Sequence, residues 1–240
     1  MCAKTLYKIA NRLLLLAGGI LFCVYISSCG KASNASPTGL DIEYQIINLS
    51  PDMGPVNLFI DFNQVNAIGN PFVFEVNQGY FFVPSTDVPY QFRTAYIADT
   101  TIFSRTDALQ TGAKYTLYIT GAQTDHSLTQ IFTVDTAVSP AIGYGLLRFV
   151  DASPTATGGL DVTANGTPAF SKIPYKTVTN YLALPIGNYD LKTYATGNTA
   201  ILNEQPSITI QDGRLYTLYA YGYSSRIDSA AFNAAVITNK

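Results

Sequence analysis

The chain has 240 residues, of which 48% are hydrophobic and only 12% are charged, about half the usual charged share of roughly 25%. After residue 28 there are sixteen acidic and eleven basic residues, a net charge of −5, and the basic residues form no cluster. Because nucleic-acid binding depends on a basic surface, we expect no nucleic-acid partner. The length suits one large domain or two small ones.

Residues 1–28 have the pattern of a bacterial lipoprotein signal peptide. Three basic residues precede an apolar stretch over residues 13–24, which is too short for a membrane span of about 20 residues. The Ile-Ser-Ser-Cys sequence that ends at Cys29 resembles a lipobox, in which the Cys is acylated and the peptide before it is removed. We therefore expect Cys29 to carry a lipid anchor. The alternative is a signal anchor that stays uncleaved.

The three Cys residues all lie in this N-terminal part, at positions 2, 23 and 29. Beyond Cys29 the chain therefore has no disulfide, no Cys-based metal site and no thiol nucleophile. Residues 30–40, which complete the segment 29–40, are small and mostly polar, a composition typical of a flexible tether. Together these features predict an outer-membrane lipoprotein of a Gram-negative cell envelope, on either face of that membrane, the cell surface included.

Residues 41–136 predict a first β domain. Short runs rich in β-branched and aromatic residues are separated by Pro, Gly and Asn turn signals. The runs cover residues 42–49, 56–62, 72–76, 80–83, 90–97, 113–120 and 128–134. No stretch of twelve or more residues has helical apolar spacing, so the domain is expected to be all-β.

After a predicted linker at residues 137–142, residues 143–240 repeat the first domain. Residues 213–222 closely match residues 112–121, and five blocks recur in the same order in both halves. Seven or more short strands in each half predict two tandem antiparallel β-sandwiches of immunoglobulin-like or transthyretin-like type. Since every block recurs within its own half, we expect each half to fold alone.

The second half resembles the DUF4397 family, a domain of unknown function. The resemblance rests on residues 148–154, 160–162, 165–166, 184–189 and 213–217, and it extends more weakly over residues 41–136. It implies a β-sandwich module that is frequent in secreted and lipid-anchored bacterial proteins and has no established activity. Asp151 stands where the family more often has His or Asn. The first half lacks both the Arg that precedes Phe149 in the second half and the Asn-Gly turn.

Residues able to do chemistry are few. His126 is the only His, and no Gly-x-Ser-x-Gly sequence or phosphate-binding Gly-rich loop occurs. Asp52, Asp61, Asp151 and Asp161 could supply the carboxylate pair of a glycosidase, but Asp beside Ser-Pro or Asn-Gly is usually a turn former. We therefore expect a non-catalytic binding or structural module with no cofactor or metal, whose ligand is a glycan or a protein. The alternative is a carbohydrate-active hydrolase that uses these Asp residues.

A row of tyrosines is the candidate ligand surface. Tyr219, Tyr221 and Tyr223 are spaced two residues apart, whereas the first copy has Thr and Ala at the last two positions. Aromatic residues found in one copy only are not required by the shared fold. A row with steps of roughly 6 to 7 Å suits stacking on sugar rings or contact with a protein. The alternative is that the row packs against the first domain or covers residues 230–238.

Three Asp-Ser/Thr triplets resemble an O-glycosylation signal used by one group of Gram-negative bacteria. The acceptors would be Thr100, Thr136 and Ser229. The alternative for each triplet is ordinary turn chemistry.

Overall fold

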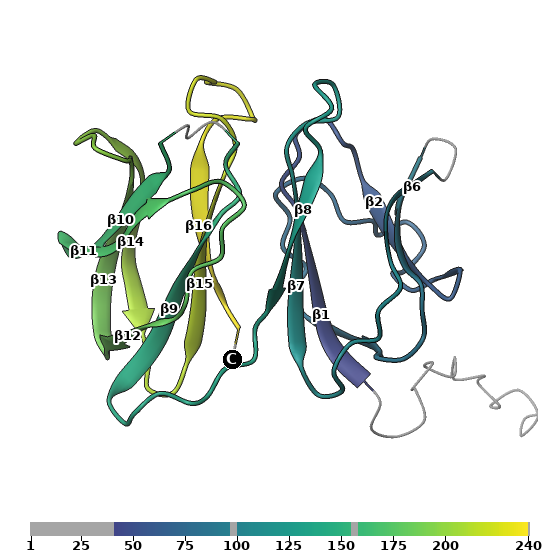
Figure 1. Cartoon of the computed structure of the whole chain (residues 1–240), viewed down its shortest axis with the longest axis horizontal. Helices are drawn as coiled ribbons and strands as arrows, with labels where there is room; N and C mark the ends of the chain where they lie inside the picture. Colours follow the sequence, from purple (N-terminus) through teal and green to yellow (C-terminus); the bar gives the residue numbers. More distant parts are fainter. Residues whose placement is uncertain (1–40, 97–99, 155–157, 240) are drawn as a thin grey trace, which may run out of the picture. The chain divides into compact units, whose positions relative to one another are not determined.

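The computed structural model describes residues 41–96, 100–154 and 158–239, which belong to one compact unit (Figure 1). Within these ranges every regular element is a β-strand, so the all-β prediction is confirmed. None of these residues belongs to a helix that could cross a membrane. The predictions for Cys29, the signal peptide and residues 30–40 lie outside the described residues.

The first sandwich takes all its strands from the first half of the chain. Two four-stranded sheets, in the orders β4-β1-β7-β8 and β3-β2-β5-β6, form its layers. The strands are β1 (Asp41–Asn48), β2 (Val56–Ile60), β3 (Asn63–Gln64), β4 (Phe81–Pro84), β5 (Tyr90–Thr94), β6 (Thr101–Arg105), β7 (Lys114–Thr120) and β8 (Thr129–Val134).

The second sandwich repeats this topology strand for strand. Its sheets have the orders β12-β9-β15-β16 and β11-β10-β13-β14, so each strand has its counterpart eight places earlier (Figure 1). The strands are β9 (Tyr144–Asp151), β10 (Leu160–Ala164), β11 (Thr167–Ile173), β12 (Leu182–Pro185), β13 (Gly187–Ala195), β14 (Ile201–Ile210), β15 (Leu215–Tyr221) and β16 (Asn233–Thr238). All ladders stay within one half, and β8 pairs with β7, so it completes the first sandwich.

One detail differs from the antiparallel sandwich expected from the sequence. In each sandwich the first strand pairs in parallel with the second-last strand of the same repeat, β1 with β7 and β9 with β15. Such a parallel pair needs a long connection, and here the intervening strands supply it, all but one of which belong to the other sheet. Parallel strands are usually covered on both faces, and all seven residues of β15 are buried.

Each sandwich has its own apolar core between its two sheets. In β2 the alternating residues Val56, Leu58 and Ile60 point inward, as the period of two dictates. The first core contains five buried aromatic side chains, among them Tyr44, whose ring lies 6.1 to 6.3 Å from four other rings. The second core has three buried aromatic side chains, Phe149, Phe170 and Tyr216, among aliphatic residues. The shared topology therefore tolerates different core packing in its two copies.

Gly222 ends β15 at a point where a side chain has no room. Its φ is +73°, and a Cβ at this position would lie 2.2 Å from the carbonyl oxygen of Ala231. Gly121, the matched residue of the first copy, would meet the Ser127 carbonyl oxygen at 2.3 Å. Gly213 has nearly the same φ, +72°, but open space around it.

We expect Gly222→Ala to lower the free energy of unfolding clearly more than Gly213→Ala. The second substitution should cost only the strain of a positive φ, about 1–2 kcal/mol, whereas the first adds a backbone clash. Urea denaturation of both variants measures the difference. Equal losses would contradict the close approach at Gly222.

Candidate functional site

The predicted tyrosine row lies between the two sandwiches. Tyr219 and Tyr221 are only 4% and 6% exposed, and both belong to an apolar cluster that residues of both halves share. The Tyr219 ring lies 5.5 Å from the ring of Tyr118 in the first sandwich and 5.8 Å from that of Tyr221. These two tyrosines therefore follow the packing alternative and offer no free surface to a ligand.

Tyr223 is separated from the other two tyrosines by a break in the strand. The positive φ of Gly222 ends the alternation of β15, and Tyr223 is half-buried beside Ala231, with which it forms an isolated β-bridge. A continuous row of three exposed rings is thus absent. The sequence comparison was misleading here because a residue present in one copy only can still be required where the two copies meet.

We call this contact the seam. It uses the same positions of both copies, since three matched pairs of the duplication lie together in its apolar cluster. The pairs are Ile47 with Val150, Leu49 with Ala152, and Tyr118 with Tyr219. A face that two copies bury against each other in matched fashion is what a symmetric dimer of one repeat would use. The seam therefore resembles a dimer interface enclosed within one chain.

A buried ion pair crosses the seam. Arg148 of β9 donates from Nη2 to Asp135, which directly follows β8 of the first sandwich. Its Nε donates to Thr217 Oγ1 at 2.9 Å, and its Nη1 donates to the carbonyl oxygen of Val134 at 2.9 Å. Burial alone would lower the pKa of Arg148, but the Asp135 carboxylate and nearby tyrosines raise it above its ordinary value.

Asp135 is equally well surrounded by donors. Its carboxylate accepts hydrogen bonds from the hydroxyls of Thr116, Thr133 and Tyr80, the last two at 2.7 Å. A charge pair removed from water is stable only when its remaining hydrogen-bonding capacity is satisfied, and this pair meets that condition. The pair is therefore a structural connection, and neither group is available to a substrate.

The duplication gives this pair a further property. Sheet registers match Arg148 with Gln45, because these residues pair with Thr217 and Thr116 respectively. Asp135 likewise matches Asn239. The backbone N–H of Asp135 donates to a carbonyl at the start of β7, and that of Asn239 donates to the equivalent carbonyl at the start of β15. Each copy thus contributes one charge where the other has a neutral amide. Only contact between a first and a second copy brings the acid and the base together.

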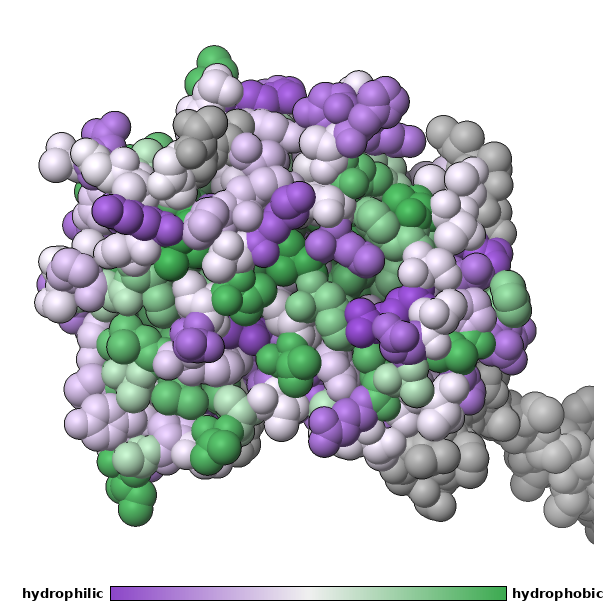
Figure 2. Space-filling view, viewed as in Figure 1, coloured by the Kyte–Doolittle hydropathy of each residue, from purple (hydrophilic) through white to green (hydrophobic). Residues whose placement is uncertain are grey.

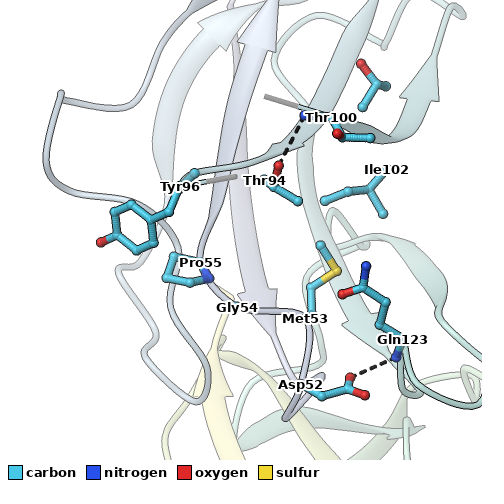
Figure 3. A pocket seen from close by; sticks show the side chains of 11 residues that line it. Asp52, Met53, Gly54, Pro55, Thr94, Tyr96, Thr100, Ile102 and Gln123 are labelled. Atoms are coloured by element: carbon cyan, nitrogen blue, oxygen red, sulfur yellow. Dashed lines mark hydrogen bonds between the residues drawn. The ribbon is translucent and has the colours of Figure 1, made fainter. Parts of the chain in front are cut away.

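A surface pocket with a volume of about 500 Å³ lies in the described part of the first sandwich. Figure 3 shows Tyr96 and Pro55 on one side of it and Met53, Ile102 and Gln123 on the other. The lining is mainly apolar, with hydroxyl and amide groups among the apolar side chains. The second sandwich has a pocket of about 370 Å³, whose lining includes Phe170, Tyr194, Asp161 and Asn198. Both are shallow surface sites without a catalytic arrangement.

Two of the candidate carboxylates hold turns together. Asp52 accepts hydrogen bonds from the backbone N–H groups of Gln123 and Thr124, at 2.8 and 2.9 Å. Asp161 accepts from the N–H of Lys172 at 2.7 Å and from the Thr196 hydroxyl at 3.0 Å. In both, burial would raise the pKa, but these donors hold it below its ordinary value. A carboxyl group with a lowered pKa is a poor general acid near neutral pH.

The remaining chemical candidates stand apart from one another. Asp61 and His126 are exposed turn residues with φ values of +46° and +59°. Among residues 41–96, 100–154 and 158–239, no three His, Cys, Asp or Glu side chains cluster as a metal site would require. These residues give no support to the hydrolase alternative.

Asp151 is the unusual carboxylate. It is fully buried, its Oδ1 accepts the Ser153 N–H at 2.8 Å, and its Oδ2 has no hydrogen-bond partner within the described part of the chain. Burial raises its pKa to about 7, although the Ser153 N–H opposes this shift. The matched residue Asn48 accepts the Ser50 N–H at 3.1 Å and donates to the Gly54 carbonyl at 2.9 Å. The position therefore suits one acceptor and one donor, which a protonated Asp provides.

The three predicted glycosylation acceptors are exposed. The backbone N–H of Lys114 donates to the Thr136 hydroxyl, and the preceding Asp135 is buried in the seam. Ser229 lies in the loop between β15 and β16, next to Asp228, which pairs with Arg226. Modification at these positions stays a prediction, and at Thr136 it would compete with the hydrogen bond from Lys114.

The family of the chain follows from a comparison with protein-family models. The model described as "Domain of unknown function (DUF4397)" matches residues 43–158 and again residues 147–240. The chain therefore belongs to the DUF4397 family and contains two copies of its domain, as the sequence resemblance predicted. A search of curated proteins finds none that matches.

We expect the ion pair of the seam to show strong coupling. Asp135→Asn should lower the free energy of unfolding by about 3–5 kcal/mol, because it leaves Arg148 buried without its counter-charge. Asp135→Asn combined with Arg148→Gln places in each copy the amide that the other copy carries, and should cost less than either single change. A double-mutant cycle in urea measures the coupling. Additive losses would contradict a paired role.

Asp151 should make stability depend on pH in a defined direction. Its pKa is about 7 when folded and about 3.9 when unfolded, so folding favours the protonated form. The stability that protonation contributes is complete below about pH 4 and is lost as the pH rises through 7. Asp151→Asn should remove this dependence and raise the melting temperature at pH 8.

The matched control for this test is Asn48→Asp, which should introduce the same pH dependence into the first sandwich. Melting temperatures measured between pH 5 and 8.5 compare the three proteins. Parallel profiles for the wild type and Asp151→Asn would show that Asp151 is ionised throughout this range.

Proposed function

We propose that this protein is a non-catalytic, lipid-anchored component of a Gram-negative cell envelope, and that its two sandwiches serve as a binding or structural module. The anchor would be the acylated Cys29, and the site of action would be the outer membrane, its outer surface included. The Ile-Ser-Ser-Cys sequence after a short apolar stretch supports the anchor.

One observation carries the non-catalytic part of the proposal. Asp52 and Asp161, the carboxylates nearest to the two pockets, are occupied by backbone donors that lower their pKa. A glycosidase needs one carboxyl group that stays protonated and a second that faces it across the substrate. Asp151 has the raised pKa of such an acid, but its side chain is fully buried.

The proposed ligand is a glycan or a protein, and the pocket of Figure 3 is the site most suited to it. Tyr96 exposes most of its ring on one side of this pocket, the amide of Gln123 lies on the other side, and the hydroxyl of Thr94 also lines it. An exposed aromatic ring next to hydrogen-bonding groups suits both a sugar and a peptide side chain. The buried seam tyrosines are not part of this site.

Lipidation is tested in the native host or in a bacterial host that processes lipoproteins. We expect the wild type to partition into detergent and Cys29→Ala to stay in the aqueous phase or to keep its uncleaved leader. Ser33→Ala, in the segment after Cys29, is a control outside the Ile-Ser-Ser-Cys sequence that leaves the thiol in place. If Cys29→Ala is processed and partitions into detergent as the wild type does, the anchor lies elsewhere.

The binding role is tested with residues 30–240 on a glycan array and on soluble polysaccharides. We expect no release of reducing sugar, and we expect Tyr96→Ala to lower the affinity for any bound glycan by about tenfold, the loss of one aromatic contact. Tyr144→Ala, which removes an exposed tyrosine far from the pocket, is the matched control. Release of sugar that Asp52→Asn or Asp161→Asn abolishes would instead establish the hydrolase alternative.

A further inference from the structure

Strand directions bring several chain segments to one end of the two sandwiches. Because β1 and β7 are parallel, both begin at this end, and β8, antiparallel to β7, finishes there. The chain then crosses to β9, which begins at the same end (Figure 1), and Arg148 in the middle of β9 bonds the carbonyl of Val134, the last residue of β8. We call this the anchor end, because β1 is where the chain enters from Cys29.

The anchor end of the second sandwich carries an exposed apolar patch. Ile142 is 93% exposed, Ile186 is 55% exposed, and Tyr144 is 39% exposed. The three are held together by backbone contacts: Ile186 N–H donates to the Gly143 carbonyl at 2.9 Å, and Tyr144 pairs with Pro185. Figure 2 shows hydrophobic atoms at the lower left edge, where β9 begins in the same view of Figure 1.

The length of chain before β1 limits what can cover this patch. Eleven residues separate Cys29 from Asp41, the first residue of β1. A coil of that length and composition spans roughly 15 to 20 Å. A lipid on Cys29 would therefore hold the anchor end within one small-domain radius of the bilayer, and the opposite end farther away.

We propose that the anchor end rests on the lipid bilayer, with Ile142, Ile186 and Tyr144 inserted into its interfacial layer. This inference rests on the proposed lipidation of Cys29. Exposed aliphatic residues next to a Tyr are typical of surfaces that enter the region of the headgroups and upper acyl chains. Two residues of opposite charge belong to this end: Asp212, whose carboxylate accepts the Gly143 N–H, and Arg214, whose carbonyl accepts the Leu146 N–H. They balance each other, so the patch suits a zwitterionic lipid surface.

The chain offers a clean spectroscopic test because it contains no Trp. Ile142→Trp and Ile186→Trp place a probe in the patch, and Ile227→Trp places one at a fully exposed position in the loop after β15, at the opposite end. All three positions face solvent, so the melting temperatures should equal that of the wild type. Cys29 is the only thiol after residue 28, so a thiol-reactive lipid can supply the anchor chemically.

The lipid-modified variants, comprising residues 29–240, are bound to vesicles of zwitterionic phosphatidylcholine with and without brominated acyl chains. Brominated lipid should quench the two patch probes by about twofold or more and leave the Ile227→Trp probe unchanged, since quenching requires contact with the acyl region. Equal fluorescence of the patch probes in both kinds of vesicle would overturn the proposal and leave the patch to a protein partner. Equal quenching at both ends would overturn it as well.

This experiment separates the inference from the proposed lipidation. Since the anchor is attached chemically, its outcome does not depend on processing in a cell. Detergent partitioning of the native protein tests lipidation by itself. A protein that lacks native lipid but shows quenched patch probes would refute the proposed anchor alone.

Discussion

The seam between the two sandwiches depends on one buried ion pair, Arg148 with Asp135. Each group is removed from water, and each has its remaining hydrogen-bonding capacity filled by hydroxyls and carbonyls. Such a pair contributes more to specificity than to net stability, because desolvation offsets most of the attraction. Since the matched positions hold Gln45 and Asn239, the pair distinguishes the first copy from the second. The duplicated face therefore forms its ion pair only where a first copy contacts a second copy.

The duplication also explains why Asp151 is tolerated. Asn48 shows that this position in the fold uses one acceptor and one donor. A carboxyl group with a pKa of about 7 can supply both while it holds its proton. The raised pKa, which in an enzyme would suggest a general acid, follows here from burial in a turn that every copy of the domain must close. Comparison of the two copies in one chain therefore distinguishes features that the fold requires from features that would serve a function.

Much of the fold could be predicted from the sequence, because period-two alternation, turn residues and the internal repeat are local signals. The parallel pairing of β1 with β7 could not, since it joins strands about seventy residues apart. The sequence indicated the contact between the sandwiches only as an alternative interpretation of the tyrosine row. Tyr221 and its counterpart Thr120 both lie in the contact between the sandwiches, but they have different roles there. Tyr221 packs in the apolar cluster, whereas the Thr120 hydroxyl donates to the Ala152 carbonyl. The difference between copies indicated a special surface correctly, but the surface faces the other sandwich.

The prediction that each half folds alone stays untested, and the seam makes it demanding, because an isolated half would expose Tyr118 or Tyr219 together with an unpaired charge. The central claim is that the seam joins both sandwiches into one cooperative unit. Differential scanning calorimetry of residues 41–240 tests it most directly. The account predicts a single transition whose van't Hoff and calorimetric enthalpies agree. Two separate transitions, each with the enthalpy of a domain of about 100 residues, would contradict it.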